Sequence, residues 1–598
     1  MSHASASASL ARWGSIYYVR LMHSDQAAAA AADLALLRRF EPVLHLNSDE
    51  LFLPAAVDRY VSACSLRQHT EQGVSILVPA GALTVENLAV AEGGRSGVFL
   101  QFVAEHERRK RHPTQRRSEN HGLARLARVG LLGRIFDVLF RVSLLLRQTV
   151  PNGVTGAAAW KARRIGLHNE PVYYGRVVRD GGWTVLHYTY FSAMNDWRST
   201  FSGVNDHEAD WEQVMVYVEE VGDTVEPHWV AYSRHDHAGD DLRRAWDDPE
   251  VILFGEHPTV FVGGGSHAGY FQPGEYVTRV EAKAIDGVKR FSAAYRRLLH
   301  ISPPPGGFGI PYVDHAGGNG VILGPGGQYE WAPRVLGPLD PWVADFRGLW
   351  GLDTADRTGG ERAPTGPRFE RDGSIRQSWV DPVGYAGLQK VAPPSRVDEI
   401  RQERLAALDL ELAALETGFD EARTRLRAEV LVGSSGADMV AAAEVELVRL
   451  RRREAELRAE RRRLETGRTA PVDRRAHIRH PAVPDPHDGS RRGRALNLWV
   501  LVSVPIVFAF AALAVRFLTH VLLWTAVVVG GFMLVEAFLR KRVVHFLWAS
   551  FATGALLGAI AVTVYFAVHD WRWALLGVFS ASGILVLLGN LRERYRRS

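Results

Sequence analysis

Cysteine is almost absent from this chain of 598 residues, in which Cys64 is the single one. One cysteine cannot form an intrachain disulfide, and it excludes a structural zinc site built on several cysteines. A nucleic-acid signature is also missing, because the formal net charge is only +5 and the excess cations flank hydrophobic segments near the C-terminus instead of covering a folded domain. We therefore expect no nucleic-acid partner.

What the chain does have is enough apolar sequence for several folded parts. Hydrophobic residues make up 47% and charged residues 23%, which excludes a wholly disordered or collagen-like protein. Shifts in composition divide the sequence into four regions. These are a β-rich domain over residues 1–395, a helical coiled-coil hairpin over 396–465, a basic Pro-rich linker over 466–494 and a membrane segment over 495–598.

The membrane segment consists of four consecutive apolar stretches, each near the ~20 residues that cross a bilayer as a helix. They cover Leu498–Val515, Leu518–Leu539, Val543–Val568 and Trp573–Leu591. This pattern predicts four transmembrane helices, with the lipid bilayer as a partner. Glu536 is the only acid inside them and lies close to a helix end, which favours an anchor over a proton path.

Cations in short loops predict which way the four helices point, because such loops stay in the cytoplasm. The clusters occupy every second connection, so both termini and the first 490 or so residues are expected on the cytoplasmic side of the cell (inner) membrane. The N-terminus shows no signal-peptide pattern, which agrees with this side. The clusters are Arg491, Arg492 and Arg494, then Arg540, Lys541 and Arg542, then Arg592, Arg594, Arg596 and Arg597.

The region before the linker repeats apolar residues at alternating steps of three and four, the seam of a coiled coil. Gly433–Gly436 interrupts the repeat, and a short Gly/Ser turn of this kind favours an antiparallel pair within one chain over a parallel dimer. Homo-oligomerisation through the same seam remains an alternative. The seam comprises Leu405, Leu408, Leu412, Leu415, Phe419, Ala422 and Leu426, then Ala443, Leu447, Leu450, Leu457 and Leu464.

Residues 1–395 alternate short β-type runs with Gly and Pro. Pro171–Arg179 and Trp183–Phe191 flank Asp180-Gly181-Gly182, which predicts a hairpin. No alternation of strand and helix is visible, so a mainly β sandwich with attached helices is the expected class. A basic, largely apolar stretch over 123–147 is predicted as a helix that lies either in the inner leaflet or against the sandwich.

Acidic and imidazole groups crowd together at His207, Asp210 and Glu212. If a strand begins at Asp210, the two carboxylates project from one face of it and repel each other unless a cation or protons intervene. Asp196 and His267, the latter in a glycine-rich loop, are expected to converge on the same place. Oxygen-rich ligation suits Mg²⁺, Mn²⁺ or Ca²⁺ better than Zn²⁺. The alternative is a solvated strand end beside an ordinary glycine turn.

Motifs for other chemistries fail at single positions. Trp211 occupies the place of the second histidine of a zinc-protease helix, so His207-Glu208 does not begin that motif. The sequence around Ser266 lacks the final glycine of a nucleophile elbow, and the glycine run lacks the Gly-Lys-Ser/Thr of a phosphate-binding loop. Serine-hydrolase and nucleoside-triphosphatase activities are therefore not expected.

Three stretches of the N-terminal domain resemble a known family when they are taken in order. Glu41–Pro54, Asp206–Val214 and His257–Phe271 are similar to conserved blocks of the vacuolar protein sorting-associated protein sixty-two family. That family is distantly similar to necrosis-inducing cytolysins, which carry a divalent-metal site on a β-sandwich. The resemblance implies metal-binding roles for His207, Asp210, Glu212 and His267, and for Asp196 by its upstream position.

The function expected from these features is a membrane-anchored cytoplasmic module that binds a divalent ion and, through it, a glycan or lipid headgroup. One alternative is a hydrolase in which His207 or His267 moves a proton and the metal activates water. A second alternative is a membrane scaffold whose pocket is vestigial. Binding and catalysis need the same ligands, so the sequence leaves these alternatives open.

Overall fold

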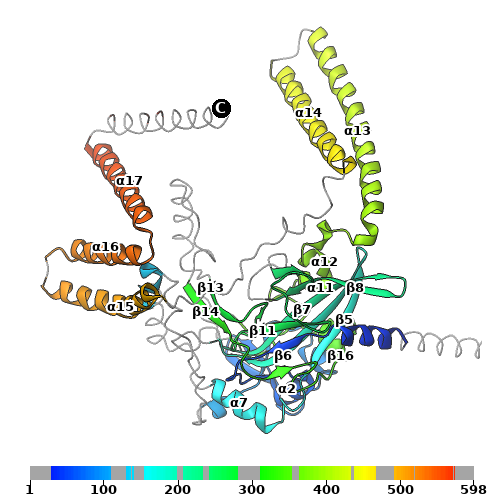
Figure 1. Ribbon diagram of the computed structural model, residues 1–598, viewed down its shortest axis with the longest axis vertical. Coiled ribbons are helices and arrows are strands. Elements are labelled where there is room, and N and C mark those ends of the chain that lie inside the picture. The colour runs from blue at the N-terminus through cyan, green and yellow to red at the C-terminus, as the bar shows by residue number, and fades with distance from the viewer. Residues whose placement is uncertain are drawn as a thin grey trace, which may run out of the picture. The chain divides into compact units, whose positions relative to one another are not determined.

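The computed structural model divides the chain into two units (Figure 1). One comprises residues 1–119, 144–280 and 312–486, and the other comprises 120–143, 281–311 and 487–598. Each is described by itself. The residues that the structure describes are 28–108, 130–135, 138–139, 154–197, 206–233, 242–280, 310–337, 339–352, 362–432, 437–466, 490–517, 519–569, 572, 579 and 583.

A six-stranded sheet forms the largest part of the first unit. Its long central strands, β6 (Trp183–Asn195) and β7 (His207–Val221), pair in antiparallel register. The predicted hairpin is confirmed, because β5 (Tyr173–Asp180) pairs with β6 around Gly181 and Gly182, whose positive φ values suit a tight turn. The sheet order is β16 (Arg334–Val335), β5, β6, β7, β8 (Thr224–Tyr232) and β9 (Arg243–Ala245).

A second, five-stranded sheet brings together segments that lie far apart in the sequence. Strand β1 (Val43–His45) pairs in parallel with β11 (His257–Val262), so Val43 lies opposite Thr259. Two of the three stretches that resemble a known family are thus neighbours in space. The other strands of this sheet are β10 (Leu253–Phe254), β12 (Gly269–Tyr270) and β15 (Ile322–Leu323).

One hydrophobic cluster draws side chains from both sheets. Leu44 and Val260 of the five-stranded sheet share it with Tyr188, Val214 and Val230 of the six-stranded sheet, and all five are at most 4% exposed. These residues follow the two-residue period of a strand, so the side chains between them point to the opposite face. The structure therefore shows mixed β-sheets with a common core, while the sandwich arrangement stays a prediction.

Helices cover the opposite face of the six-stranded sheet. Phe191 and Tyr174 from that face belong to a cluster with Tyr60 of α2 (Val57–Ala63) and Ala158 of α7 (Val154–Arg164). Burial on both faces explains why every residue of β6 is buried. Shorter elements complete the unit: β2 (Ser65–Thr70), β3 (Gly73–Val78), β4 (Val98–Gln101), β13 (Gly274–Val280), β14 (Ile310–Ala316), α3 (Leu88–Glu92), α4 (Glu105–Arg108), α10 (Pro341–Ala344), α11 (Gln377–Val380) and α12 (Pro382–Tyr385).

Two long helices, α13 (Val397–Val432) and α14 (Ala437–Glu465), lie side by side (Figure 1). Ion pairs join Arg404 to Glu460 and Glu411 to Arg453. Residue numbers thus increase along α13 in the direction in which they decrease along α14. The two helices therefore run antiparallel. Leu408 and Leu457 of the predicted seam are almost fully buried. The predicted turn over 433–436 lies outside the described residues.

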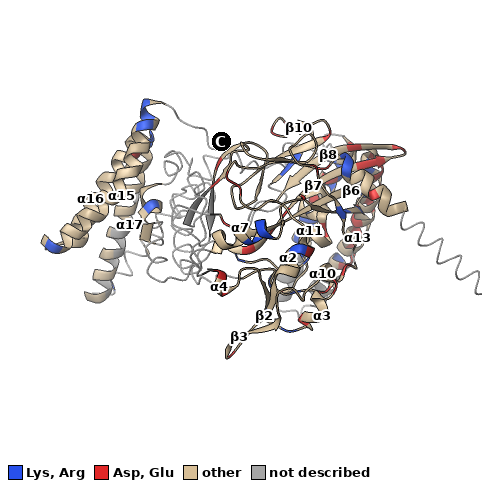
Figure 2. Cartoon of the chain, turned by 90° about the horizontal axis from the view of Figure 1, so that it is seen from below, with Lys and Arg blue, Asp and Glu red and all other residues tan. Residues whose placement is uncertain are grey.

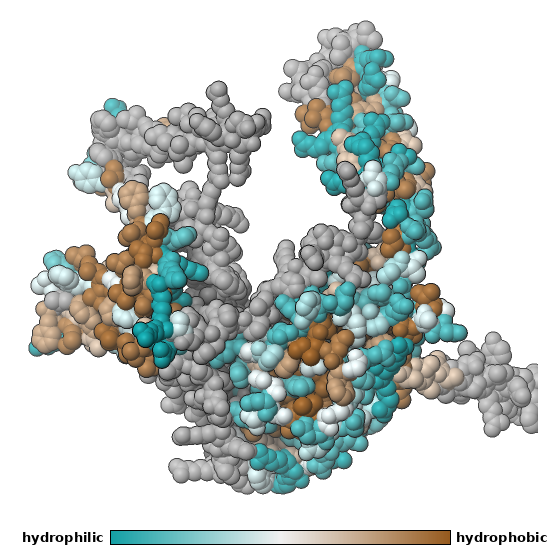
Figure 3. All heavy atoms as spheres, in the orientation of Figure 1, coloured by the Kyte–Doolittle hydropathy of each residue, from teal (hydrophilic) through white to brown (hydrophobic). Residues whose placement is uncertain are grey.

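The second unit contains apolar helices. Among the described residues, α15 (Arg491–Phe517) and α16 (Val521–Leu539) are long and apolar enough to cross a membrane. Figure 2 shows cations at their ends, and Figure 3 shows mainly hydrophobic residues along them. The third predicted span coincides with the helix α17 (Val543–His569), and most of the fourth, Trp573–Leu591, lies outside the described residues. Four spans thus stay a prediction.

Candidate functional site

The first residues of β7 depart from regular strand geometry. The strand begins at His207, three residues before the expected start, and Ala209 has a φ of 64°, which residues other than glycine seldom adopt. This break lies between Glu208 and Asp210, and it separates the environments of two acids that are close in sequence.

Glu208 stabilises the packing of the first unit through hydrogen bonds to backbone amides. Its carboxylate accepts hydrogen bonds from the backbone amides of Phe102 at 2.9 Å, Val103 at 2.8 Å and Leu352 at 3.1 Å. A Cβ at Gly351 would lie 2.0 Å from the Glu208 carbonyl oxygen, so the chain passes very close to the strand here. Glu208 is therefore a buried structural carboxylate that fastens two loops to β7.

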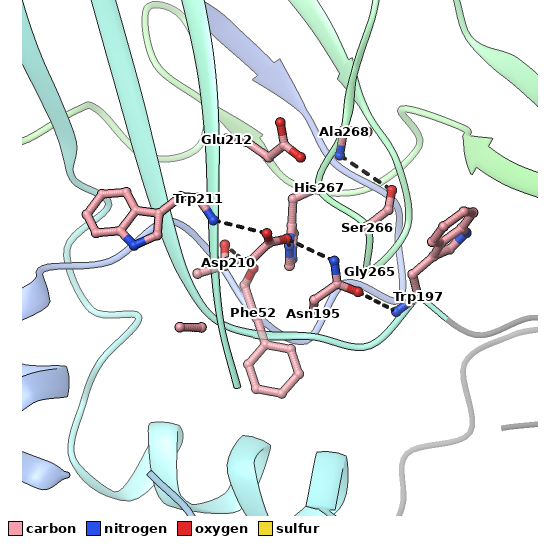
Figure 4. Close-up of polar contacts among 12 residues, drawn as sticks. Phe52, Asn195, Trp197, Asp210, Trp211, Glu212, Gly265, Ser266, His267 and Ala268 are labelled. Carbon is pink, nitrogen blue, oxygen red and sulfur yellow. Dashed lines mark hydrogen bonds and ion pairs between the residues drawn. The ribbon is translucent and has the colours of Figure 1, made fainter. Parts of the chain in front are cut away.

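Asp210 contacts the imidazole of His267 directly. His267 Nδ1 lies 2.8 Å from Asp210 Oδ2, and both residues are largely buried (Figure 4). Asn195 Nδ2 also donates to Asp210 Oδ2 at 3.2 Å, and the Trp211 amide donates to Oδ1 at 3.0 Å. The structure thus brings together two predicted site residues that are 57 positions apart in sequence.

Glu50 is a member of the same cluster that sequence reasoning missed. Its Oε1 lies 3.6 Å from His267 Nε2, and its Oε2 accepts the Gly265 amide at 3.0 Å. The side chain is 2% exposed. Glu50 stands within Glu41–Pro54, the first of the stretches that resemble a known family, which was the only signal that could have found it.

The two carboxylates determine the charge of His267. Burial by itself lowers the pKa of this imidazole, but the hydrogen bond to Asp210 and the negative charges of Asp210 and Glu50 together raise it to about 10. His267 is therefore a cation at neutral pH in the protein without a bound ion. The imidazolium balances part of the negative charge that the carboxylates bring into a buried place.

Glu212 shares a cavity with Asp210 and His267. The cavity is partly open to solvent, and apolar residues of both sheets, such as Val214 of β7 and Val262 of β11, also line it. Glu212 Oε2 accepts a short hydrogen bond from the Ser233 hydroxyl. The expectation that both carboxylates project from one face of the strand agrees with this lining.

Asp196 and His207 contact the site less directly. The Asp196 amide donates to the Gly265 carbonyl at 3.0 Å, so Asp196 lies beside the loop that carries His267, and it is 1% exposed. The His207 Nδ1–H donates to the Ala209 carbonyl at 2.8 Å. Within the described part of the chain, no group of three or more His, Cys, Asp or Glu residues is arranged to hold a metal ion.

The glycine-rich loop has a buried support in Asp314. Its Oδ2 accepts the hydroxyls of Ser266 and Tyr270, each at 2.6 Å, and the residue is 0% exposed. A Cβ at Gly263 would lie 2.5 Å from the same oxygen, so only glycine fits there without a shift. No sequence motif marks Asp314, which comes to the loop through the pairing of distant segments.

Comparisons with known proteins do not assign this chain to a family. No family model matches the sequence, and no curated protein matches it. Two solved structures are similar over short segments. One, the non-toxic HaNLP3 protein, is 17% identical over 15% of this chain with a TM-score of 0.13. The other, necrosis and ethylene inducing protein 2 from the causal agent of cocoa's witches' broom disease, is 22% identical over 16% with a TM-score of 0.13.

These similarities are weak. The matched part spans 39% of each of the two solved chains, which is well under their full length. The similarity is to necrosis-inducing proteins, and no match supports the expected vacuolar protein sorting-associated domain. Neither comparison carries an argument about function.

Proposed function

We propose that the first unit is a binding module that holds a divalent cation at Asp210, Glu212 and His267 and, through it, a polar ligand such as a glycan or lipid headgroup. The observation that carries the proposal is the lining of one cavity by two carboxylates and an imidazole, with the buried carboxylate of Glu50 beside them. In this proposal the two mixed sheets act as a β-sandwich with the cavity between them.

The donor atoms suit such an ion, which would displace the proton of His267 when it binds. His267 Nε2 is buried and makes no hydrogen bond within the described residues, and Glu50 Oε1 is 3.6 Å away. Carboxylate oxygens with one imidazole favour Mg²⁺, Mn²⁺ or Ca²⁺ over Zn²⁺. Asp196 and His207, which lie beside the loop and at the start of β7, complete the proposed ligand set.

Binding is favoured over hydrolysis because the hydroxyls of Ser233 and Ser266 donate to carboxylates, those of Glu212 and Asp314, and not to an imidazole. The Ser266 hydroxyl donates to the buried carboxylate of Asp314 and not to an imidazole, so it is held in place instead of activated. Any reaction would have to use metal-bound water, as in the alternative hydrolase.

The proposed location follows from the apolar helices and their flanking cations. We place the first unit on the cytoplasmic side of the inner membrane, with both termini inside, because clusters of Arg and Lys lie at the start of α15 and directly after α16. A module in this position reaches lipid headgroups of the inner leaflet or glycans assembled at that surface.

The test uses the full-length protein in detergent, with a glycan array and phosphoinositide-containing vesicles as probes. We expect binding to at least one probe that EDTA abolishes and added Mg²⁺, Mn²⁺ or Ca²⁺ restores, without release of phosphate or sugar. Turnover of a probe by the wild type that disappears in His207→Ala and His267→Ala would reject the binding module and support the alternative hydrolase. Binding that is indifferent to EDTA would contradict the metal and favour the scaffold.

A further inference from the structure

Arg134 is a buried cation in the second unit, although it lies some 360 residues before the apolar helices in sequence. It belongs to a short helical turn at 131–135. This turn lies within 123–147, the stretch for which the sequence allowed a helix either in the inner leaflet or against the sandwich. Only 2% of its side chain is exposed, and the neighbouring Leu131 is equally buried. An arginine is almost never buried to this degree without partners.

Its partners come from the helices α15 and α16. Arg134 Nη2 lies 2.7 Å from Glu536 Oε2 of α16, and Nη1 lies 3.4 Å from Oε1, a two-point contact of guanidinium with carboxylate. Nη2 also donates to the Ser503 hydroxyl of α15 at 2.9 Å. The side chain of Glu536 is 5% exposed, so both charges are removed from solvent.

This contact explains the one acid within the predicted spans. Glu536 also accepts from Arg540 Nε at 2.9 Å, so two guanidinium groups neutralise one carboxylate. A buried carboxylate that loses one of its charged partners becomes strongly unfavourable. Arg540 is one helical turn after Glu536, at the end of α16, and Arg134 is the partner that comes from outside the two helices. The backbone of the segment is close as well, since a Cβ at Gly130 would lie 3.9 Å from Glu536 Oε1.

We propose that residues 130–135 are a second membrane anchor, which docks into the helices α15 and α16 through Arg134, Glu536 and Ser503. The chain leaves the first unit after residue 119 and returns to it at residue 144. The first unit is consequently connected in sequence to the second unit at three places, which are this stretch, residues 281–311 and the linker. This inference does not depend on the proposed metal site.

The test severs the linker in the full-length protein. A specific protease site is inserted between residues 467 and 489, and native membranes are cleaved, washed with high salt and EDTA, and sedimented. Salt weakens exposed charge contacts and EDTA removes any metal-mediated headgroup binding. A fragment that stays after the wash is therefore held by buried contacts within the second unit, which includes residues 120–143 and 281–311, and the variants change only the contact of Arg134. We expect the N-terminal fragment of the wild type to stay in the pellet and that of Arg134→Glu to move to the supernatant.

Two variants make the result specific. The double variant Arg134→Glu/Glu536→Arg exchanges the charges and is expected to restore retention, which a general folding defect would not do. Arg95→Glu makes the same charge change at an exposed residue of the first unit and is expected to behave as wild type. If Arg134→Glu does not accumulate, Arg134→Gln removes the charge without inverting it and should also lose retention. Release of the wild-type fragment, or retention in both Arg134 variants, would overturn the proposal.

Discussion

Two acids that are separated by a single residue have different roles in this protein. Glu208 is surrounded by backbone amides on the helix-covered side of the sheet, whereas Asp210 meets the imidazole of His267. The positive φ of Ala209 lies between them. A buried carboxylate satisfied by neutral amides contributes to stability, while one that faces another titratable group and a cavity is available for binding.

Replacement of Glu208 by alanine is expected to lower the free energy of unfolding by about 3 kcal/mol, because backbone amides of two loops lose their acceptor in a buried place. Thermal unfolding of the full-length protein in detergent, followed by tryptophan fluorescence, measures the loss. Glu226→Ala on the exposed β7–β8 hairpin is the control and should stay within about 0.5 kcal/mol of wild type. Equal midpoints for the two variants would contradict the structural role.

His187 predicts a pH dependence of stability. Burial, and then the charge of Arg176, hold the pKa of its imidazole well below the usual value. Arg176 Nε donates to its Nδ1 at 3.0 Å, and its Nε2 lies 2.7 Å from Gln213 Oε1, so the folded protein holds the neutral ring. Only the unfolded chain takes up the proton as the pH falls through about 6.5, so stability is lost below that pH.

Between pH 6.5 and pH 5, His187→Gln should therefore lose less stability than wild type, by up to about 2 kcal/mol. The unfolding midpoint of each protein across this range provides the measurement. Parallel curves for the two proteins would show that His187 is not the titrating group.

Secondary elements differ in how far their partners could be predicted. The β5–β6 hairpin was predictable because Asp180-Gly181-Gly182 is a local turn signal. The parallel pairing of β1 with β11 was not, because more than two hundred residues separate the strands and no periodicity specifies such a neighbour. The candidate site follows the same rule: Asp210 and Glu212 were found from local spacing, while Glu50 and Asp314 reach the loop only through long-range pairing.

The antiparallel pair of α13 and α14 gives a test with a matched control. Leu408 of α13 is 0% exposed, and Leu410, two positions further along the same helix, is 74% exposed. Leu408→Asp should open the pair and expose it to limited proteolysis, because a charge would be buried against α14. Leu410→Asp should leave the digestion rate near that of wild type. Equal digestion of the two variants would contradict burial of the predicted seam.

The chain as a whole combines a β-rich unit with apolar helices, and the sidedness of those helices was predicted from loop charge. A reporter fused after Ser598 is expected to behave as cytoplasmic, and one inserted near Asp570 as external. Activity of paired reporters that are functional on only one side of the membrane gives the result. The reverse pattern would place the first unit outside the cell membrane.

The metal content of the full-length protein tests the proposed function most directly. Purified wild type should carry close to one divalent ion per chain, and Asp210→Asn with Glu212→Gln should abolish it, because both carboxylates line the cavity beside His267. Asp223→Asn with Glu226→Gln removes the same charge at exposed positions and should keep the ion. Elemental analysis that finds equal metal in the wild type and in the Asp210/Glu212 variant would contradict the proposal.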